Sequence, residues 1–318
     1  MESRNERQPD KSLEIPPFNS ANNVNGINGD PANTGSGLAI QTTSEPAAAL
    51  ATQQAYVRKV IDTVGDLDNV LYESSNESNT NSAQWQYDII NYIKIYEATK
   101  PKQHPVGMTA MWCPICDSSN TAIFNSPADW VSPLRGGYDT DPPANNGAKV
   151  IIADVDHIWP TNPTMWAWQS FTRGLNPILM DDLGGTGINV GDPVVSFDPK
   201  YYPIRAGMTQ TARYAARMDL RTARSNGNLS STGYMLANPG AQYLAFAPNG
   251  GNFTVNLSAG SGSSFSVEWF NISTGATVMG ASITGGSSIQ TFTPPFSGSA
   301  VLFLNKLSGL RSALSLLT

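Results

Sequence analysis

The chain contains 318 residues, carries a formal charge of -6 and has only 14% charged residues. Its length favours two domains over one, because single hydrophobic cores stop growing at about 250–300 residues. No apolar run approaches the ~20 residues of a membrane span. The acidic balance offers no general electrostatic attraction to nucleic acid or anionic lipid. We therefore expect no membrane partner and no nucleic-acid partner, and the uncharged polar surface suits a protein that handles neutral polymers.

The first part of the chain, residues 1–50, is rich in Asn, Gly, Pro, Ser and Thr and has no apolar periodicity. This composition predicts a long, largely irregular segment. The start of the chain also lacks the basic stretch and apolar stretch of a signal peptide.

Residues 51–228 alternate between short apolar runs and helical patterns. The spacing of Val57, Val60, Ile61 and Val64 places them on one helix face, and this helix is expected to end near Gly65. Alternation of this kind predicts βα units around a parallel sheet. Strands are expected at 69–75, 105–111, 128–132, 149–155 and 176–181, and further helices at 85–96, 165–173 and 207–220.

After residue 228 the helical pattern disappears, and short β-runs recur up to residue 305. Phe265, Val267 and Trp269 alternate with polar residues, so each strand is expected to have one buried and one wet face. Residues 229–305 are therefore predicted to form a separate antiparallel β-sandwich, with Trp269 in its core, and residues 306–318 form a tail. The fold class predicted for the whole chain is α/β plus all-β.

The segment VLYESSNES, residues 70–78, delivers Asn76 and Glu77 just after an extended run. It resembles the fourth strand of the large superfamily of retaining glycoside hydrolases, in which the acid/base Glu directly follows an Asn. Active sites of (β/α)8 barrels lie at this end of the strands. The resemblance implies that Glu77 is the acid/base and that Asn76 binds the sugar 2-hydroxyl. The alternative is a carboxylate in a surface loop.

Retaining hydrolysis needs a second carboxylate about 5–5.5 Å from the first, and in this superfamily it lies on the seventh strand. Asp154 and Asp156 in KVIIADVDHIW have the same parity on an extended strand. Asp156 is the preferred nucleophile and Asp154 the alternative, although Glu is usual here; both could instead only cap the following turn. The residues expected to contact the substrate are Asn76, His157, Trp159, Trp112 and Trp130.

The resemblance extends over most of residues 15–305, through ANNVNGINGD, SPADWVSP, WAWQSFTRGLNPILMD and the following β-runs. Together these are similar to a bacterial family with a glycoside hydrolase-like (β/α)8 (TIM) barrel and a C-terminal module named as a collagen-binding domain. By that comparison the chain looks N-terminally truncated, since residues 69–75 form the fourth strand. The truncation implies an exposed sheet edge beside residues 69–75, which would either pair with another chain or be covered by the N-terminal segment, and weak or no hydrolysis.

The predicted function is that of a glycoside hydrolase-like protein acting on a polysaccharide, extracellular or periplasmic in its intact form. The alternatives are a non-catalytic protein that binds a polysaccharide, collagen or another extracellular polymer, and a gene fragment without independent function. We expect no cofactor and no metal. Cys113 and Cys116 are expected to form a local disulfide or remain free thiols, because too few further ligands for zinc are present. A run of arginines is expected to form a solvated basic face: Arg213, Arg217, Arg221 and Arg224.

Overall fold

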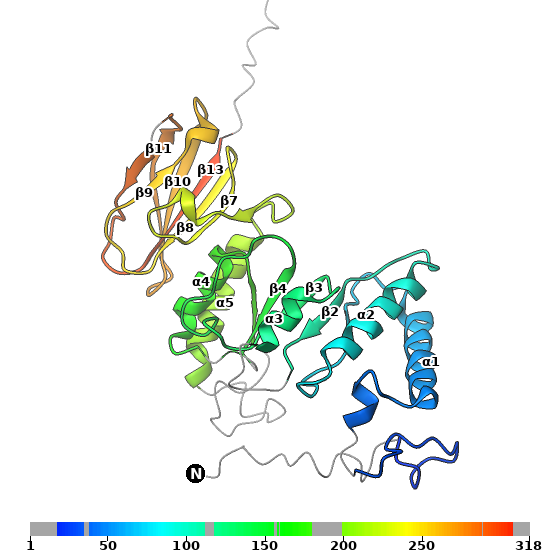
Figure 1. The fold of residues 1–318 in the computed structure, drawn as a ribbon. Helices are drawn as coiled ribbons and strands as arrows, with labels where there is room; N and C mark the ends of the chain where they lie inside the picture. Colours follow the sequence, from blue (N-terminus) through cyan, green and yellow to red (C-terminus); the bar gives the residue numbers. More distant parts are fainter. Residues whose placement is uncertain are drawn as a thin grey trace, which may run out of the picture. The chain divides into compact units, whose positions relative to one another are not determined.

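The computed structural model describes residues 18–34, 38–111, 118–155, 158, 160–179, 199–287 and 289–307 (Figure 1). The chain divides into two compact units, Met1–Leu134 and Arg135–Thr318. None of the helices in these described ranges has the length and apolar character needed to cross a membrane. The domain limits expected from the sequence stay a prediction.

The first unit contains a parallel sheet in the order β1-β2-β3. Its strands are β1 (Tyr72–Glu73), β2 (Val106–Thr109) and β3 (Trp130–Ser132). Each lies within a run that the sequence predicts as a strand. The helices are η1 (Leu38–Gln41), α1 (Ala47–Val64), α2 (Ala83–Glu97) and α3 (Ser118–Asn125). Helix α1 begins earlier than its apolar spacing indicates, because the alanines after Pro46 are strong helix formers.

The two faces of this sheet differ in polarity. One face is apolar: Met108 pairs in register with Val131, and both side chains are fully buried. The other face carries Glu73, Gly107 and Trp130, which are register partners on neighbouring strands. A Cβ at Gly107 would lie 1.9 Å from the Trp130 ring. Glycine is therefore required at this position for the indole to lie across the sheet.

A buried ion pair joins α2 to the start of β2. His104 donates its backbone N–H to Glu97 Oε2 at 3.0 Å, and its Nδ1 lies 2.7 Å from Glu97 Oε1. The other ring nitrogen lies 2.8 Å from the carbonyl oxygen of Leu67, which follows α1. Because both nitrogens face acceptors, this arrangement fits the imidazolium. The pKa of His104 is raised, first by the hydrogen bond to Glu97 and then by that to Leu67.

The raised pKa of His104 predicts a pH-dependent stability. The folded state favours the protonated ring, so its stabilisation is complete below about pH 6.5 and is lost as the pH rises through the raised pKa. We expect the urea midpoint of His104→Gln to fall less between pH 6 and 9, as approximate limits, than that of the wild type. Equal pH slopes in the two proteins would contradict this prediction.

The second unit begins with two parallel strands, β4 (Val150–Asp154) and β5 (Asn176–Ile178). They are linked through α4 (Pro163–Thr172), which begins with Asn162 accepting the N–H of Met165 and Pro163 in the first turn. Helix α5 (Tyr202–Ala215) packs on α4. A Cβ at Gly207 would lie 2.8 Å from Ala167 Cβ, so the glycine allows the two helices to approach closely.

The rest of the second unit is a β-sandwich of a six-stranded sheet, β11-β10-β13-β8-β7-β6, and a two-stranded sheet, β12-β9 (Figure 1). Trp269 lies in the core between them, as the sequence predicts. Short strands recur through residues 229–305, as the sequence predicts. The strands are β6 (Arg224–Ser225), β7 (Met235–Asn238), β8 (Gln242–Ala247), β9 (Phe253–Asn256), β10 (Ser264–Asn271), β11 (Thr277–Thr284), β12 (Ile289–Phe292) and β13 (Ala300–Lys306).

The expectation of one wet face per strand is wrong for the six-stranded sheet. Its second face packs on α4 and α5, and strands β8 and β13 are buried along most of their length. The ring of Trp168 lies 6.1 Å from that of Phe246, and the ring of Tyr214 lies 5.7 Å from that of Phe303. Strand β9 does alternate as predicted, because it belongs to the smaller sheet.

The four arginines of the basic face predicted around α5 are exposed, and one of them, Arg217, also pairs with a carboxylate of the sandwich. Arg217 donates to both carboxylate oxygens of Glu268, at 2.7 and 2.6 Å, and Tyr214 donates to Oε1 at 2.8 Å. Glu268 is only 8% exposed, although the alternation of β10 predicts a wet position. Three hydrogen bonds allow its carboxylate to be buried. Arg221 does remain exposed, paired with Asp219.

Loss of the Arg217 guanidinium should destabilise the fold. Hydrogen bonds from Arg217 are the main cause of the lowered pKa of Glu268, and Arg217→Ala leaves that carboxylate without its cation. We expect a loss of about 2 kcal/mol in urea unfolding at pH 7, below the 3–5 kcal/mol of fully buried pairs because water reaches Arg217.

The matched control is Arg221→Ala, whose exposed pair with Asp219 should leave the unfolding free energy almost unchanged. The deficit of Arg217→Ala should shrink as the pH falls through the lowered pKa of Glu268, since stabilisation by this carboxylate is present above about pH 4.5. The Arg217 guanidinium also lies over the Phe303 ring, 4.7 Å from its centroid, and a deficit independent of pH would assign the effect to the loss of this packing.

Candidate functional site at the strand ends

Glu77 has an unusual backbone conformation in the turn four residues after the end of β1. Its φ is 46°, in the left-handed region, and the other described non-glycine residue with a positive φ is Asn33. A glutamate in this region costs about 1–2 kcal/mol, and such strain is concentrated at functional sites. Glu77 is half-buried and the preceding Asn76 is exposed. The turn therefore presents both residues that the sequence singles out.

Hydrogen bonds from three directions hold this turn in place. The Ser74 hydroxyl donates to Gln86 Oε1 of α2 at 2.8 Å. The Asn79 amide donates to Gln41 Oε1 of η1 at 3.0 Å. Within the turn, the Ser78 hydroxyl donates to that of Ser75. The surrounding helices thus fix the strained conformation on both sides of Glu77.

The polar face of the sheet carries Trp130, which the sequence singles out, and adds Glu73, Thr109 and Ser132, which the sequence reasoning missed. The Thr109 hydroxyl lies 2.7 Å from Glu73 Oε1 and 3.1 Å from the carbonyl oxygen of Ser75. Trp130 and Ser132 are 8% and 2% exposed, and within the described part of the chain Trp130 Nε1 and Ser132 Oγ have no hydrogen-bond partner. The sequence did contain a signal for this polar face. Successive side chains of a strand point to opposite faces, so Glu73 and Ser75 lie on the face opposite Tyr72.

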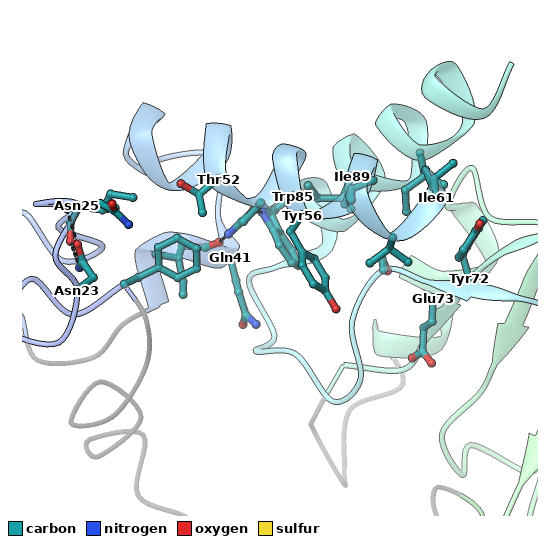
Figure 2. A pocket seen from close by; sticks show the side chains of 18 residues that line it. Asn23, Asn25, Gln41, Thr52, Tyr56, Ile61, Tyr72, Glu73, Trp85 and Ile89 are labelled. Atoms are coloured by element: carbon teal, nitrogen blue, oxygen red, sulfur yellow. Dashed lines mark hydrogen bonds between the residues drawn. The ribbon is translucent and has the colours of Figure 1, made fainter. Parts of the chain in front are cut away.

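A cavity of about 650 Å³ lies beside β1, between α1, α2 and the N-terminal segment (Figure 2). Most of its lining is aliphatic or aromatic, including Val57, Ile61 and Ile89 from the two helices. Figure 2 shows Glu73 and Tyr72 at one end and Asn23 and Asn25 at the other. The N-terminal segment therefore lines a cavity together with β1, while the expectation that it covers the sheet edge stays a prediction. Glu77 does not line this cavity.

Asp154 is the last residue of β4, in the second unit, and is 5% exposed. Its carbonyl oxygen accepts the N–H of Ile158 at 2.9 Å, in a turn that directly follows the strand. Glu77 belongs to the first unit. Four other predicted site residues, Asp156, His157, Trp159 and Trp112, lie outside the described residues, as do Cys113 and Cys116. The described residues hold no group of His, Cys, Asp and Glu suited to a metal ion.

Residues 224–304 match the model of a family described as "Putative collagen-binding domain of a collagenase". This range begins at β6 and ends within β13, so it coincides with the strands of the sandwich. No curated protein matches the chain.

Several solved structures share the fold over most of the chain. One is a glycoside hydrolase with a TM-score of 0.55 and 12% identity, covering 80% of this chain and 69% of that one. Another is a glycoside hydrolase of family 5 from Bacteroides vulgatus ATCC 8482, with a TM-score of 0.53 and 13% identity, covering 79% of this chain and 66% of that one. The chain thus spans about two thirds of their length. The predicted fold class, βα units around a parallel sheet followed by an antiparallel β-sandwich, is confirmed.

Proposed function

We propose that the chain acts on a polysaccharide as a retaining glycoside hydrolase, with Glu77 as the acid/base. The observation that carries the proposal is the left-handed backbone of Glu77, held by hydrogen bonds of Ser74 and Asn79 at the C-terminal end of a parallel strand. A surface-loop carboxylate has no reason to retain this strain. Folding energy spent on a fixed carboxylate is typical of a catalytic site.

The second carboxylate in this proposal is Asp156, with Asp154 as the alternative. In the first step, neutral Glu77 protonates the glycosidic oxygen while the aspartate oxygen bonds to the anomeric carbon, and the leaving sugar departs as an alcohol. In the second step, the Glu77 carboxylate takes a proton from water. The resulting oxygen bonds to the anomeric carbon and releases the aspartate.

Substrate contacts in the proposal come from Asn76 and from the polar sheet face. Trp130 Nε1 is a donor and Ser132 Oγ is both donor and acceptor, and neither has a protein partner among the described residues. Both atoms are buried, so a sugar hydroxyl pairs with them only when neighbouring side chains move aside. His157, Trp159 and Trp112 complete the proposed set of sugar contacts. The low charge content favours a neutral polysaccharide, which implies an extracellular or periplasmic location.

The acid role of Glu77 is tested by comparing how much Glu77→Gln slows the reaction on substrates whose leaving groups do and do not need protonation. Glu77→Gln should slow hydrolysis of the natural polysaccharide about 10²–10⁴-fold, because a carboxamide cannot protonate the leaving oxygen. Formation of the glycosyl-enzyme from a dinitrophenyl glycoside, whose leaving group needs no protonation, should lose far less. Single-turnover assays on a panel of plant and microbial polysaccharides detect even a slow wild type. Equal losses on both substrates, or none, would remove the acid role.

The strain at Glu77 predicts opposite effects on stability and activity. Glu77→Gly should abolish hydrolysis but raise the unfolding free energy by about 1 kcal/mol, because glycine adopts a positive φ without steric cost. The matched control is Asn33→Gly at the other left-handed residue, φ 54°, which should gain stability and retain activity. Thermal unfolding and the assay above provide both readouts. A destabilised Glu77→Gly protein would show that the side chain has a structural role.

A second candidate function is binding of collagen or a polysaccharide by the sandwich, and the family match at residues 224–304 favours it. It is tested by sedimenting the full chain with fibrillar collagen and with insoluble polysaccharides. Binding unchanged in Glu77→Gln would place the ligand on the sandwich. Binding that disappears in this variant would place the ligand at the strand ends.

A further inference from the structure

Strand β11 (Thr277–Thr284) forms one edge of the six-stranded sheet, with β10 as its neighbour. Figure 1 shows it at the margin of the sandwich. Seven of its eight residues are exposed, including Met279 at 63% and Val278 at 39%. An edge strand of this length presents a row of backbone donors and acceptors that can pair with another strand.

The devices that normally protect an edge strand are missing from most of β11. The strand contains no charged residue and no proline, and no charged residue occurs anywhere from Trp269 to Asn305. The one irregularity of the β10–β11 ladder lies between Phe265 and Val267. Residues 277–280 are paired regularly, so this half of the edge is free of the bulge.

The direction of the backbone groups follows from the ladder. Asn271 donates its N–H to the carbonyl of Ala276, and Val278 pairs with Trp269. Because antiparallel ladders alternate, the N–H and C=O groups of Thr277 and Met279 point away from β10. Exposed apolar side chains therefore stand beside outward-facing backbone groups in this half of the strand.

We propose that β11 pairs with β11 of a second copy of this chain, antiparallel across a two-fold axis. Such pairing continues the antiparallel sheet from one copy into the other, and the same residues serve both sides, as a two-fold interface requires. Charge permits this occupant, because residues 269–305 contain no charged residue. Beside this half of β11, the charge of Glu268, the register partner of Met279, is paired with Arg217, and the exposed Arg213 lies 3.5 Å from Thr277 Oγ1. Val278 and Met279 supply the apolar contacts.

The proposal predicts a dimer in solution that depends on β11. Sedimentation velocity of the full chain over a wide concentration range should show a reversible monomer–dimer equilibrium. Met279→Lys should raise the dissociation constant at least about tenfold, because the two-fold axis brings two ammonium groups close together. Met279→Pro should act similarly, by removing an outward N–H without breaking the ladder to β10.

The control is Ile289→Lys on β12, which adds the same charge at a side chain that is 64% exposed, away from the edge. This variant should dimerise like the wild type. Unchanged thermal unfolding of the Met279 variants shows that their fold is intact. A wild type that remains monomeric overturns the proposal. This holds also if the monomer binds an added extended peptide at β11. A dimer that Met279→Lys leaves unchanged or that Ile289→Lys disrupts overturns it as well.

Discussion

Burial of both faces of the six-stranded sheet is the constraint on which the second unit depends. One face closes on the β12-β9 sheet, and the other receives Trp168 and Tyr214 from α4 and α5. The helices α4 and α5 of the βα part thus form a second hydrophobic core with the outer face of the six-stranded sheet. This shared core makes the carboxylate of Glu268 a buried group, which explains why Arg217 must meet it with two hydrogen bonds.

In the first unit the two faces of the sheet differ in polarity. The face turned to the helices is packed with Met108 and Val131, whereas the opposite face carries Glu73, Thr109 and Trp130. Gly107 permits this arrangement, since the indole occupies the space that any side chain would need. A sheet that is apolar on the helix side and polar on the other can support a site while retaining its core.

Strands β1 and β11 each lie at an edge of their sheet, and their surroundings differ. β1 lies beside a cavity of about 650 Å³ that is lined mostly by aliphatic and aromatic side chains, some of them from the N-terminal segment. β11 is exposed on both faces and uncharged, although it belongs to a sheet that is otherwise among the most buried parts of the protein. Strands β8 and β13 are buried, whereas β11 is exposed and has no charged side chain to protect its edge. This exposed, uncharged edge is what the proposed interface with a second copy would cover.

Local pattern in the sequence located most helices and strands, because apolar spacing of 3.6 or 2 residues depends only on near neighbours; it did not predict α3 or β6. It also identified the turn at Asn76 and Glu77 and the core position of Trp269. The tertiary structure alone decided the strained φ of Glu77, the indole of Trp130 over Gly107 and the burial of Glu268, because each depends on residues from another element. The alternation along β10 correctly placed Glu268 on the face opposite Trp269. It also predicted that this face is exposed to water, which is wrong because α5 packs on it.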